Sequence, residues 1–231
     1  NLFLSSLFGA QMHFTGAADS HWGELEVVRE SLVEELRASG AAPYGIPIGG
    51  STPVGAAGYA AALFEMSEQF AAAGIEPVAV VHTSSSGGTH AGLVAGRALL
   101  RERGHHVPDV LAIGVAKGVN MGLPDVAEMA RDTVEMLGGS RDLVEPGDVQ
   151  IDPDWMGDDY AVPTRAGDAA IRWAATHGGW VLDRTYSGKG FAGLIGNAEA
   201  GRWRPGGDIV FVHTGGQPAI FAPEAGLALE R

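Results

Sequence analysis

The sequence predicts an α/β protein in which helices cover both faces of a parallel sheet. Short β-branched runs alternate with amphipathic or alanine-rich segments along the chain, and no hairpin signal joins two strands. Three of the predicted strands run into loops of Gly, Ser and Thr, which is typical of strand-to-helix connections. The 231 residues include 35 glycines, which suits many such turns. This length is enough for one large domain, or for one domain and part of another.

Two helices in the first third of the chain have clear sequence signals. Apolar residues at helical spacing, with an outer face rich in Glu, predict a helix over residues 22–38. Ser51 or Thr52 can cap a second helix that has Pro53 in its first turn and runs to about Ala73. The small residues of this second helix that we expect to pack on a sheet are Gly55, Gly58 and Ala62.

The remaining elements follow from the same two periodicities. Strands are expected over residues 10–15, 43–48, 78–81, 109–116, 148–152, 180–183 and 208–213. Further helices are expected over residues 1–8, 91–100, 124–137 and 165–176. An irregular polar loop over 154–163 holds Tyr160, and residues 185–190 form another strand-to-helix turn.

The segment TSSSGGT, residues 83–89, is the most informative loop of the sequence. It lies between a β-branched strand and a helix, so its backbone N–H groups and the positive end of the helix point at one place. The Ser and Thr hydroxyls can donate further hydrogen bonds there. A bound phosphate and a well-capped turn without a ligand explain the pattern about equally well. The spacing matches neither a Walker loop nor the dinucleotide glycine pattern.

Three polar loops, over residues 83–90, 185–190 and 213–216, follow predicted strands or begin helices. Ligands of open parallel sheets bind at the carboxyl ends of the strands, so these loops are expected to converge on one cleft, with Tyr160 nearby. The prediction is a phosphate-bearing cofactor or substrate held by Ser, Thr, Tyr and backbone amides.

Composition and charge exclude several classes of function. The formal net charge is −13 and no basic cluster occurs, which argues against nucleic acid or an anionic membrane as partner. The absence of cysteine excludes disulfides, a thiol nucleophile and Cys-based metal sites. The histidines show no recognised metal spacing, so no metal site is expected. No apolar run is long enough to span a bilayer, and the first residues make a poor signal peptide.

Several motifs together resemble one family of enzymes. They are Gly49-Gly50-Ser51, SGGTHAG over residues 86–92, Tyr160 in DDYAVP, YSGK over 186–189 and HTGG over 213–216. In this order they resemble the D-cysteine desulfhydrase and 1-aminocyclopropane-1-carboxylate (ACC) deaminase family. These are pyridoxal-phosphate (PLP) enzymes of the tryptophan-synthase-β fold type, fold type II. The resemblance covers essentially the whole chain.

The resemblance implies a two-domain α/β fold with PLP between the domains. Residues 1–50 would be the latter part of the smaller domain, and 51–231 most of the larger, PLP-binding one. A small amino-acid substrate, a homo-oligomer and a cytoplasmic location are implied in the same way. The residues that the resemblance assigns to the PLP phosphate are Ser86, Gly87, Gly88 and Thr89.

Tyr186 and Tyr160 match two active-site tyrosines of the family. A tyrosine facing the substrate can exchange a proton if cationic neighbours lower its pKa. Without the resemblance, an interior aromatic with a satisfied hydroxyl is the simpler interpretation for each. Thr214 would be a further neutral contact beside the cofactor ring.

Ser187 departs from the ACC deaminase pattern, which has a glutamate that looks placed to keep the pyridine nitrogen protonated. A neutral serine gives a weaker electron sink. This suits β-elimination of a good leaving group and disfavours opening of a cyclopropane ring.

The family's N-terminal Gly-Gly-Asn-Lys-type motif, which supplies the lysine that binds PLP, and its Ser-Asn-His-type motif are not found in this sequence. We therefore expect the N-terminal third of the fold to be missing and the chain alone to be inactive. Lys189 and Lys117 are the two lysines present, and neither corresponds to the family's PLP lysine.

Three further functions remain open alongside a D-cysteine desulfhydrase. An L-cysteate sulfo-lyase would expel a sulfonate instead of a thiolate, and an ACC deaminase is disfavoured by Ser187. A non-catalytic phosphate-binding module would explain the missing lysine. A hydrolase has weaker support, because no Gly-x-Ser-x-Gly elbow occurs.

Overall fold

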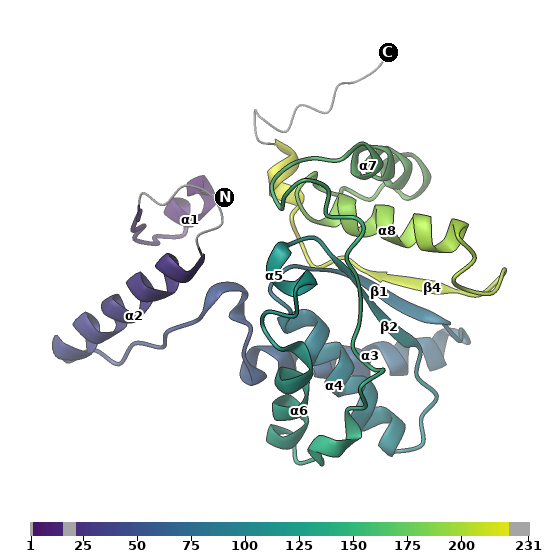
Figure 1. The fold of residues 1–231 in the computed structure, drawn as a ribbon, viewed down its shortest axis with the longest axis horizontal. Coiled ribbons are helices and arrows are strands. Elements are labelled where there is room, and N and C mark those ends of the chain that lie inside the picture. The colour runs from purple at the N-terminus through teal and green to yellow at the C-terminus, as the bar shows by residue number, and fades with distance from the viewer. Residues whose placement is uncertain (1, 16–21, 222–231) are drawn as a thin grey trace. The chain divides into compact units, whose positions relative to one another are not determined.

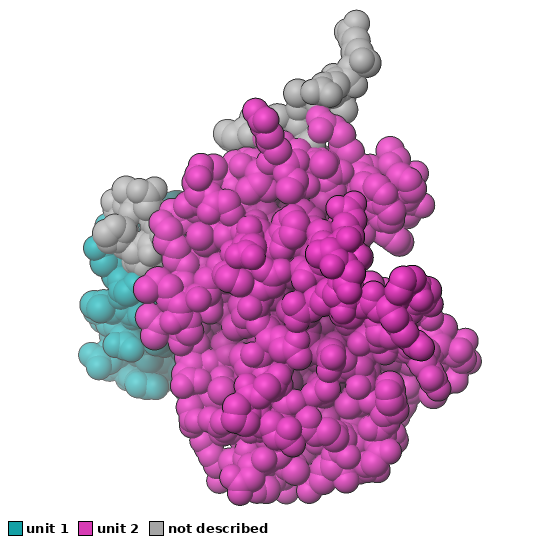
Figure 2. Space-filling model, turned by 45° about the vertical axis from the view of Figure 1, so that its right-hand side comes forward, with its two compact units in different colours: residues 1–51 teal, residues 52–231 magenta. Residues whose placement is uncertain are grey.

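The computed structural model describes residues 2–15 and 22–221 of the chain. These residues belong to two compact units, residues 1–51 and 52–231, which Figure 2 distinguishes by colour. The expectations for Asn1 and for residues 222–231 fall outside the described residues. The assignment of residues 1–50 and 51–231 to two domains of a PLP fold stays a prediction.

The regular elements in the described part of the first unit are all helices. They are α1 (Leu2–Leu7), α2 (Trp22–Ala38) and the short 3-10 helix η1 (Ile48–Gly50). The strands expected over 10–15 and 43–48 are wrong. Residues 10–14 are exposed. In the second segment the prolines at 43 and 47 have no N–H to donate, and the Ile48 N–H is bound by the Glu26 carboxylate at 2.8 Å instead of a neighbouring strand.

The second unit is built on one parallel sheet with the strand order β3-β2-β1-β4. The strands are β1 (Ala79–Ser84), β2 (Asp109–Gly114), β3 (Gln150–Asp152) and β4 (Ile209–Val212). The helices are α3 (Pro53–Ala73), α4 (Gly88–Glu102), α5 (Lys117–Asn120), α6 (Val126–Met136), α7 (Arg165–Gly178) and α8 (Ser187–Glu199), with 3-10 helices η2 (Arg141–Leu143) and η3 (Gln217–Phe221). None of the described helices is long and apolar enough to cross a membrane.

Helices lie on both faces of this sheet, as the sequence predicts. In Figure 1, α7 and α8 lie on one side of β1 and β4, whereas α3, α4 and α6 lie on the other. The six residues of the central strand β1 are all buried. Its register places Ala79 beside Asp109 of β2 and beside Ile209 of β4. The carboxyl ends of these strands therefore meet at one edge of the sheet.

Helices α3 and α4 approach each other through glycines of α4. A Cβ on Gly92 would lie 2.1 Å from the Ala56 carbonyl oxygen, and one on Gly96 would lie 2.9 Å from that of Ala60. The buried face of α3 is formed by Ala56, Ala60 and Leu63. The expectation that Gly55, Gly58 and Ala62 form the packed face is therefore wrong, because α3 packs on a helix and uses a different stripe.

In the second unit the ends of the predicted elements move by a few residues, and one expected strand is absent. Thr52 caps α3 by accepting from the Gly55 N–H at 3.2 Å, as predicted. Residues 180–183 are not a strand. Leu182 packs between α7 and α8, and the Val181 carbonyl is bound by the His213 ring at 3.0 Å. This segment is thus held by side-chain packing and a side-chain hydrogen bond instead of backbone hydrogen bonds to a neighbouring strand.

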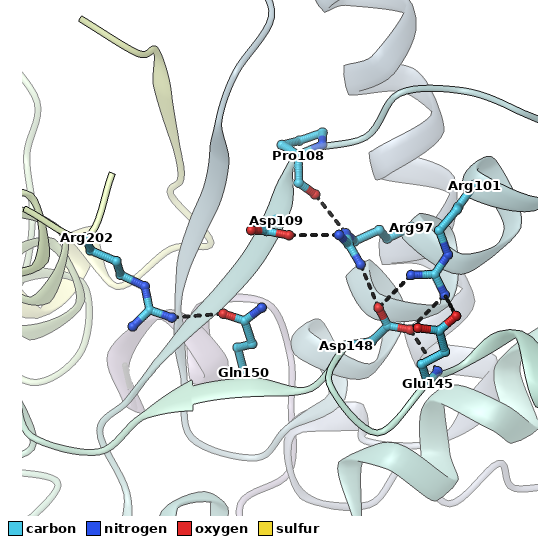
Figure 3. A network of polar contacts seen from close by, with 8 residues as sticks. All are labelled: Arg97, Arg101, Pro108, Asp109, Glu145, Asp148, Gln150 and Arg202. Carbon is cyan, nitrogen blue, oxygen red and sulfur yellow. Dashed lines mark hydrogen bonds and ion pairs between the residues drawn. The ribbon is translucent and has the colours of Figure 1, made fainter. Parts of the chain in front are cut away.

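An arginine pair joins α4 to the loop before β3 (Figure 3). The Asp148 carboxylate accepts from Arg97 at 2.6 Å and from Arg101 at 2.8 and 3.0 Å. Arg97 also binds the Pro108 carbonyl and Asp109, at the start of β2. The strand β3 begins at Gln150, two residues after Asp148. The same contacts fix the far end of α4, the helix that begins at the Gly/Ser loop.

Burial alone would raise the pKa of Asp148. The hydrogen bonds from Arg101 and the Glu145 amide, with the charges of both arginines, reverse this effect and lower the pKa below its ordinary value. A lowered folded-state pKa means that the ionised carboxylate stabilises the fold above its unfolded pKa of about 4 and loses this effect as the pH falls through the folded value.

We expect Asp148→Asn to lower the free energy of unfolding by about 2–4 kcal/mol at neutral pH, because two arginines lose the buried carboxylate that they share. Urea unfolding at several pH values measures the effect, and the gap from the parent chain should narrow below about pH 4. The control is Asp109→Asn, which removes an exposed partner of the same Arg97. Equal losses for the two variants would contradict this role of Asp148.

Candidate functional site

The site begins where β1 passes into α4. The strand ends at Ser84, and the helix begins at Gly88 after a residue with positive φ, Gly87 at +83°. A Cβ on Gly87 would lie 2.9 Å from a Val126 methyl carbon, so both the backbone conformation and the space require glycine. No side chain caps α4 at Gly87. Its first N–H groups therefore remain suited to an anion.

The sequence-predicted phosphate residues lie together at this turn. Gly87 and Gly88 are buried, and Ser86 and Thr89 are half-buried. Just before them, the Ser84 hydroxyl is buried and has no hydrogen-bond partner within the described chain. A buried polar atom without a partner is costly, and a polar ligand in the loop would relieve that cost.

Asp183 organises the start of α8. Its carboxylate, 1% exposed, accepts four hydrogen bonds. The donors are the N–H groups of Thr185 and Tyr186, both at 2.9 Å, and the N–H and hydroxyl of Ser187 at 2.8 and 2.6 Å. The carboxylate is thus an acceptor for the otherwise free amides of the first turn. It also lies against the last polar loop, since a Cβ on Gly216 would be 2.3 Å from its Oδ1.

Tyr186 connects α8 to the central strand. Its hydroxyl donates to the Thr83 carbonyl at 2.7 Å, one residue before the end of β1. A Cβ on Gly190 would lie only 1.8 Å from the Thr83 hydroxyl, so the missing side chain lets α8 approach β1. The TSSSGGT and TYSGKG loops therefore meet, as the sequence predicts.

Tyr160 and Thr214 complete the group. Tyr160 lies close to Ser85 and to Asp183, and Thr214 lies beside Tyr186. Burial is the first cause that raises the pKa of Tyr186, to about 12, and it also raises the pKa of Tyr160. The direction is opposite to the lowering by cationic neighbours that the sequence suggests. Both phenols keep their protons at neutral pH and act as hydrogen-bond donors.

Ser187 is 1% exposed, and its hydroxyl is engaged twice by Asp183. It donates to Oδ1 at 2.6 Å and accepts from the Asp183 N–H at 2.9 Å. Because its only proton is already donated, Ser187 can offer a neighbouring group one remaining lone pair. Whether this lone pair faces a cofactor ring stays a prediction.

A buried histidine pair supports the loop from inside. His82 binds the Thr83 carbonyl at 2.9 Å and His90 at 3.1 Å, and both rings are fully buried. Burial lowers the pKa of His82 to about 4, and burial and His82 lower that of His90. Both rings are thus neutral. The Thr83 carbonyl oxygen accepts hydrogen bonds from both the His82 ring and the Tyr186 hydroxyl. In the part of the chain that the structure describes, no three potential His, Asp or Glu ligands gather as at a metal site.

The two lysines are both engaged in the fold. Lys189 is fully buried and donates to the carbonyls of Met156, Asp159 and Tyr160. Lys117 is exposed and pairs with the Asp159 carboxylate at 3.2 Å. Sequence reasoning identified the hydroxyls, glycines and tyrosines of the site, but it missed Asp183 and the role of Lys189. An aspartate two residues before the TYSGKG turn was the available signal.

Comparison with known proteins places this arrangement in a family. A family model described as pyridoxal-phosphate dependent enzyme matches residues 1–215, so the chain belongs to the PALP family of PLP-dependent enzymes. A solved structure described as an ACC deaminase homologue superposes with a TM-score of 0.81 and 31% identity, covering 95% of this chain and 62% of that one. The parallel α/β fold predicted from the sequence is confirmed.

Curated relatives point to one branch of this family. D-cysteine desulfhydrase of Salmonella paratyphi C is 34% identical over 223 residues, which are 96% of this chain and 64% of the relative. D-cysteine desulfhydrase of Serratia proteamaculans is 35% identical over 223 residues, with the same coverage. The chain thus spans 64% of the length of these relatives. The predicted resemblance to the D-cysteine desulfhydrase and ACC deaminase family is confirmed.

Asp183→Asn is expected to lower the free energy of unfolding by about 2–4 kcal/mol, because an amide cannot accept four hydrogen bonds as the carboxylate does. Urea unfolding measures the change. The matched control, Asp132→Asn, removes an exposed ion-pair partner of Arg141 and should change stability little. If the two variants unfold at the same urea concentration, Asp183 does not organise α8.

Proposed function

We propose that this chain binds PLP at the carboxyl ends of β1 and β4, as part of a lyase that acts on a D-cysteine-like amino acid. The overall reaction is D-cysteine and water to pyruvate, ammonia and hydrogen sulfide. The observation that carries the proposal is the uncapped start of α4 beside two half-buried, protonated tyrosines. The membership in the PLP-dependent family and the names of the relatives support it.

The residues present fit a phosphate ester of the size of PLP. Ser86, Gly87, Gly88 and Thr89 would hold the phosphate with backbone N–H groups and hydroxyls. The partnerless Ser84 hydroxyl lies just before them and supplies a further donor. The fold itself, with these loops at the carboxyl ends of parallel strands, is where such ligands bind in open α/β sheets.

When bound, PLP supplies an electron sink for negative charge at the α-carbon of an amino acid. The residues of this chain would orient the cofactor ring and the substrate for that reaction. Ser187 and Thr214 would contact the ring as neutral groups, and Tyr186 and Tyr160 would face the substrate as proton donors. Tyr186 is held by its hydrogen bond to the Thr83 carbonyl, which uses its only proton, so it would have to release that carbonyl before donating to a substrate, and the raised pKa values keep both phenols protonated.

The neutral Ser187 favours elimination of a good leaving group over opening of the ACC ring. L-Cysteate sulfo-lyase chemistry uses the same neutral contacts and differs in the leaving group. The relatives at 34–35% identity are named D-cysteine desulfhydrase, and this name favours a thiolate as the leaving group. A small amino-acid substrate, a homo-oligomer and a cytoplasmic location stay predictions from the sequence.

A non-catalytic phosphate-binding module is the second candidate. One observation favours it: Lys189 and Lys117 are each engaged in other contacts, so neither is offered to the cofactor. This chain would then bind PLP without a covalent link.

The phosphate loop is tested by Gly87→Ala in a PLP titration followed by visible absorbance. A Cβ at this position meets Val126 and strains a positive φ, so PLP affinity should fall by about tenfold or more. Gly104→Ala is the matched control, because Gly104 follows the other end of α4 with φ +78° and nothing within 4 Å of an added Cβ. Equal losses of affinity would show that the Gly87 loop does not hold PLP, and so would an unchanged affinity in Gly87→Ala.

Borohydride reduction of the PLP-loaded chain, followed by peptide mapping, tests the role of the lysines. We expect bound PLP but no labelled lysine, because leaving its site would break all three hydrogen bonds of Lys189. Release of sulfide from D-cysteine and of ammonia from ACC is measured on the same sample, with free PLP as background. Any turnover should rank D-cysteine above ACC. Stoichiometric labelling of Lys189 or Lys117 would make the chain a self-sufficient enzyme.

A further inference from the structure

Lys189 is a charged side chain with no exposed surface. It lies in the first turn of α8, three residues after Tyr186. Its Nζ lies 2.7 Å from the Met156 carbonyl oxygen, 2.8 Å from that of Asp159 and 3.0 Å from that of Tyr160. An ammonium group has three N–H donors, so these three carbonyls satisfy all of them. A buried charge with this complete set of partners is tolerated, whereas one without it would be very costly.

The three carbonyls belong to one irregular segment between β3 and α7. They point toward the same atom, although carbonyl dipoles aimed at one place repel each other without a cation. Outside this cluster, the Asp159 carboxylate binds the Tyr160 N–H at 2.8 Å and Lys117 at 3.2 Å. Lys189 thus contacts this segment from inside at three of its residues, one of which is Tyr160.

We propose that Lys189 is a positioning residue whose ammonium group serves as a built-in cation, folding the Met156–Tyr160 segment and holding Tyr160 at the site. One short helical segment would then place both tyrosines, Tyr186 directly and Tyr160 through Lys189. The inference rests on the proposed function only for the role of Tyr160 toward substrate. A Lys189 ammonium group bound to three carbonyls cannot at the same time be the lysine that binds PLP covalently.

The test uses the whole chain without PLP and compares Lys189→Met with Lys117→Met. Limited digestion with chymotrypsin, which cuts after aromatic residues, reports on the segment through Trp155 and Tyr160. We expect cleavage there to be about tenfold faster or more in Lys189→Met, because the carbonyls lose their cation and the segment opens more often. Lys117→Met, which removes an exposed contact to the same segment, should digest at the parent rate. Equal rates for Lys189→Met and the parent chain would overturn the proposal.

A rescue experiment separates a cation effect from general damage. Lys189→Ala keeps the Cβ, and n-propylammonium supplies the atoms that the substitution removes. Added n-propylammonium should restore protection from cleavage in a saturable manner, whereas n-propanol and n-propyltrimethylammonium, which lack the charge or the N–H donors, should not. If Lys189→Ala fails to fold, recovery of its native circular dichroism on refolding with n-propylammonium alone is the expected result. Failure of rescue, or equal rescue by the controls, would overturn the proposal.

PLP titration of the same variants distinguishes this inference from the proposed function. Lys189→Met should bind PLP with nearly the parent affinity, because the phosphate loop is unchanged, and still show the faster cleavage. A parent chain that binds no PLP would refute the proposed function and leave the cleavage result intact. Labelling of Lys189 by PLP and borohydride would instead overturn the positioning role, since the ammonium would not reside among the carbonyls.

Discussion

The Asp183 carboxylate holds the turn from which most of the candidate site is built. It accepts three backbone N–H groups and the Ser187 hydroxyl, and this starts α8 directly after an irregular segment. The start of that helix presents Tyr186 toward the end of β1 and Lys189 toward the segment that bears Tyr160, while the Ser187 hydroxyl stays bound to Asp183. The buried Asp183 carboxylate therefore fixes how α8 begins, and the start of α8 in turn fixes where Tyr186 and Lys189 lie.

The geometry of the candidate site also requires helices to approach the sheet and each other closely, and glycines allow this approach. Gly190 leaves room for the Thr83 hydroxyl, and a Cβ on Gly193 would lie 2.7 Å from an Ile113 methyl carbon, so α8 lies tightly over β1 and β2. Gly92 and Gly96 do the same for α4 against α3. Because α8 is seated this closely, the Tyr186 turn is brought within hydrogen-bond distance of β1, the strand that leads into the phosphate loop.

Sequence patterns predicted the parts of this structure that depend on local chemistry. The Thr52 cap, the Gly/Ser turn between β1 and α4 and the convergence of the polar loops follow from residue type and strand order, whereas the sequence left open whether that turn is capped. The strands expected over 43–48 and 180–183 failed because their backbone groups are satisfied by the distant side chains of Glu26 and His213. Lys189 could not be interpreted correctly for the same reason, since its partners lie about 30 residues earlier in a loop without regular structure.

The electrostatics of the described residues keep both tyrosines of the candidate site protonated. Burial raises the pKa values of Tyr186 and Tyr160, and the negative charge of Asp183 adds to the effect on both. Asp159 and Asp183 in turn favour the charged form of Lys189, although burial dominates and lowers its pKa. Asp183 thus links the two halves of the site: it organises α8 through hydrogen bonds and helps to keep both phenols protonated through its charge. Since a protonated phenol cannot act as a base, the proposed elimination would use the two tyrosines to orient a substrate, and proton abstraction would have to come from another group.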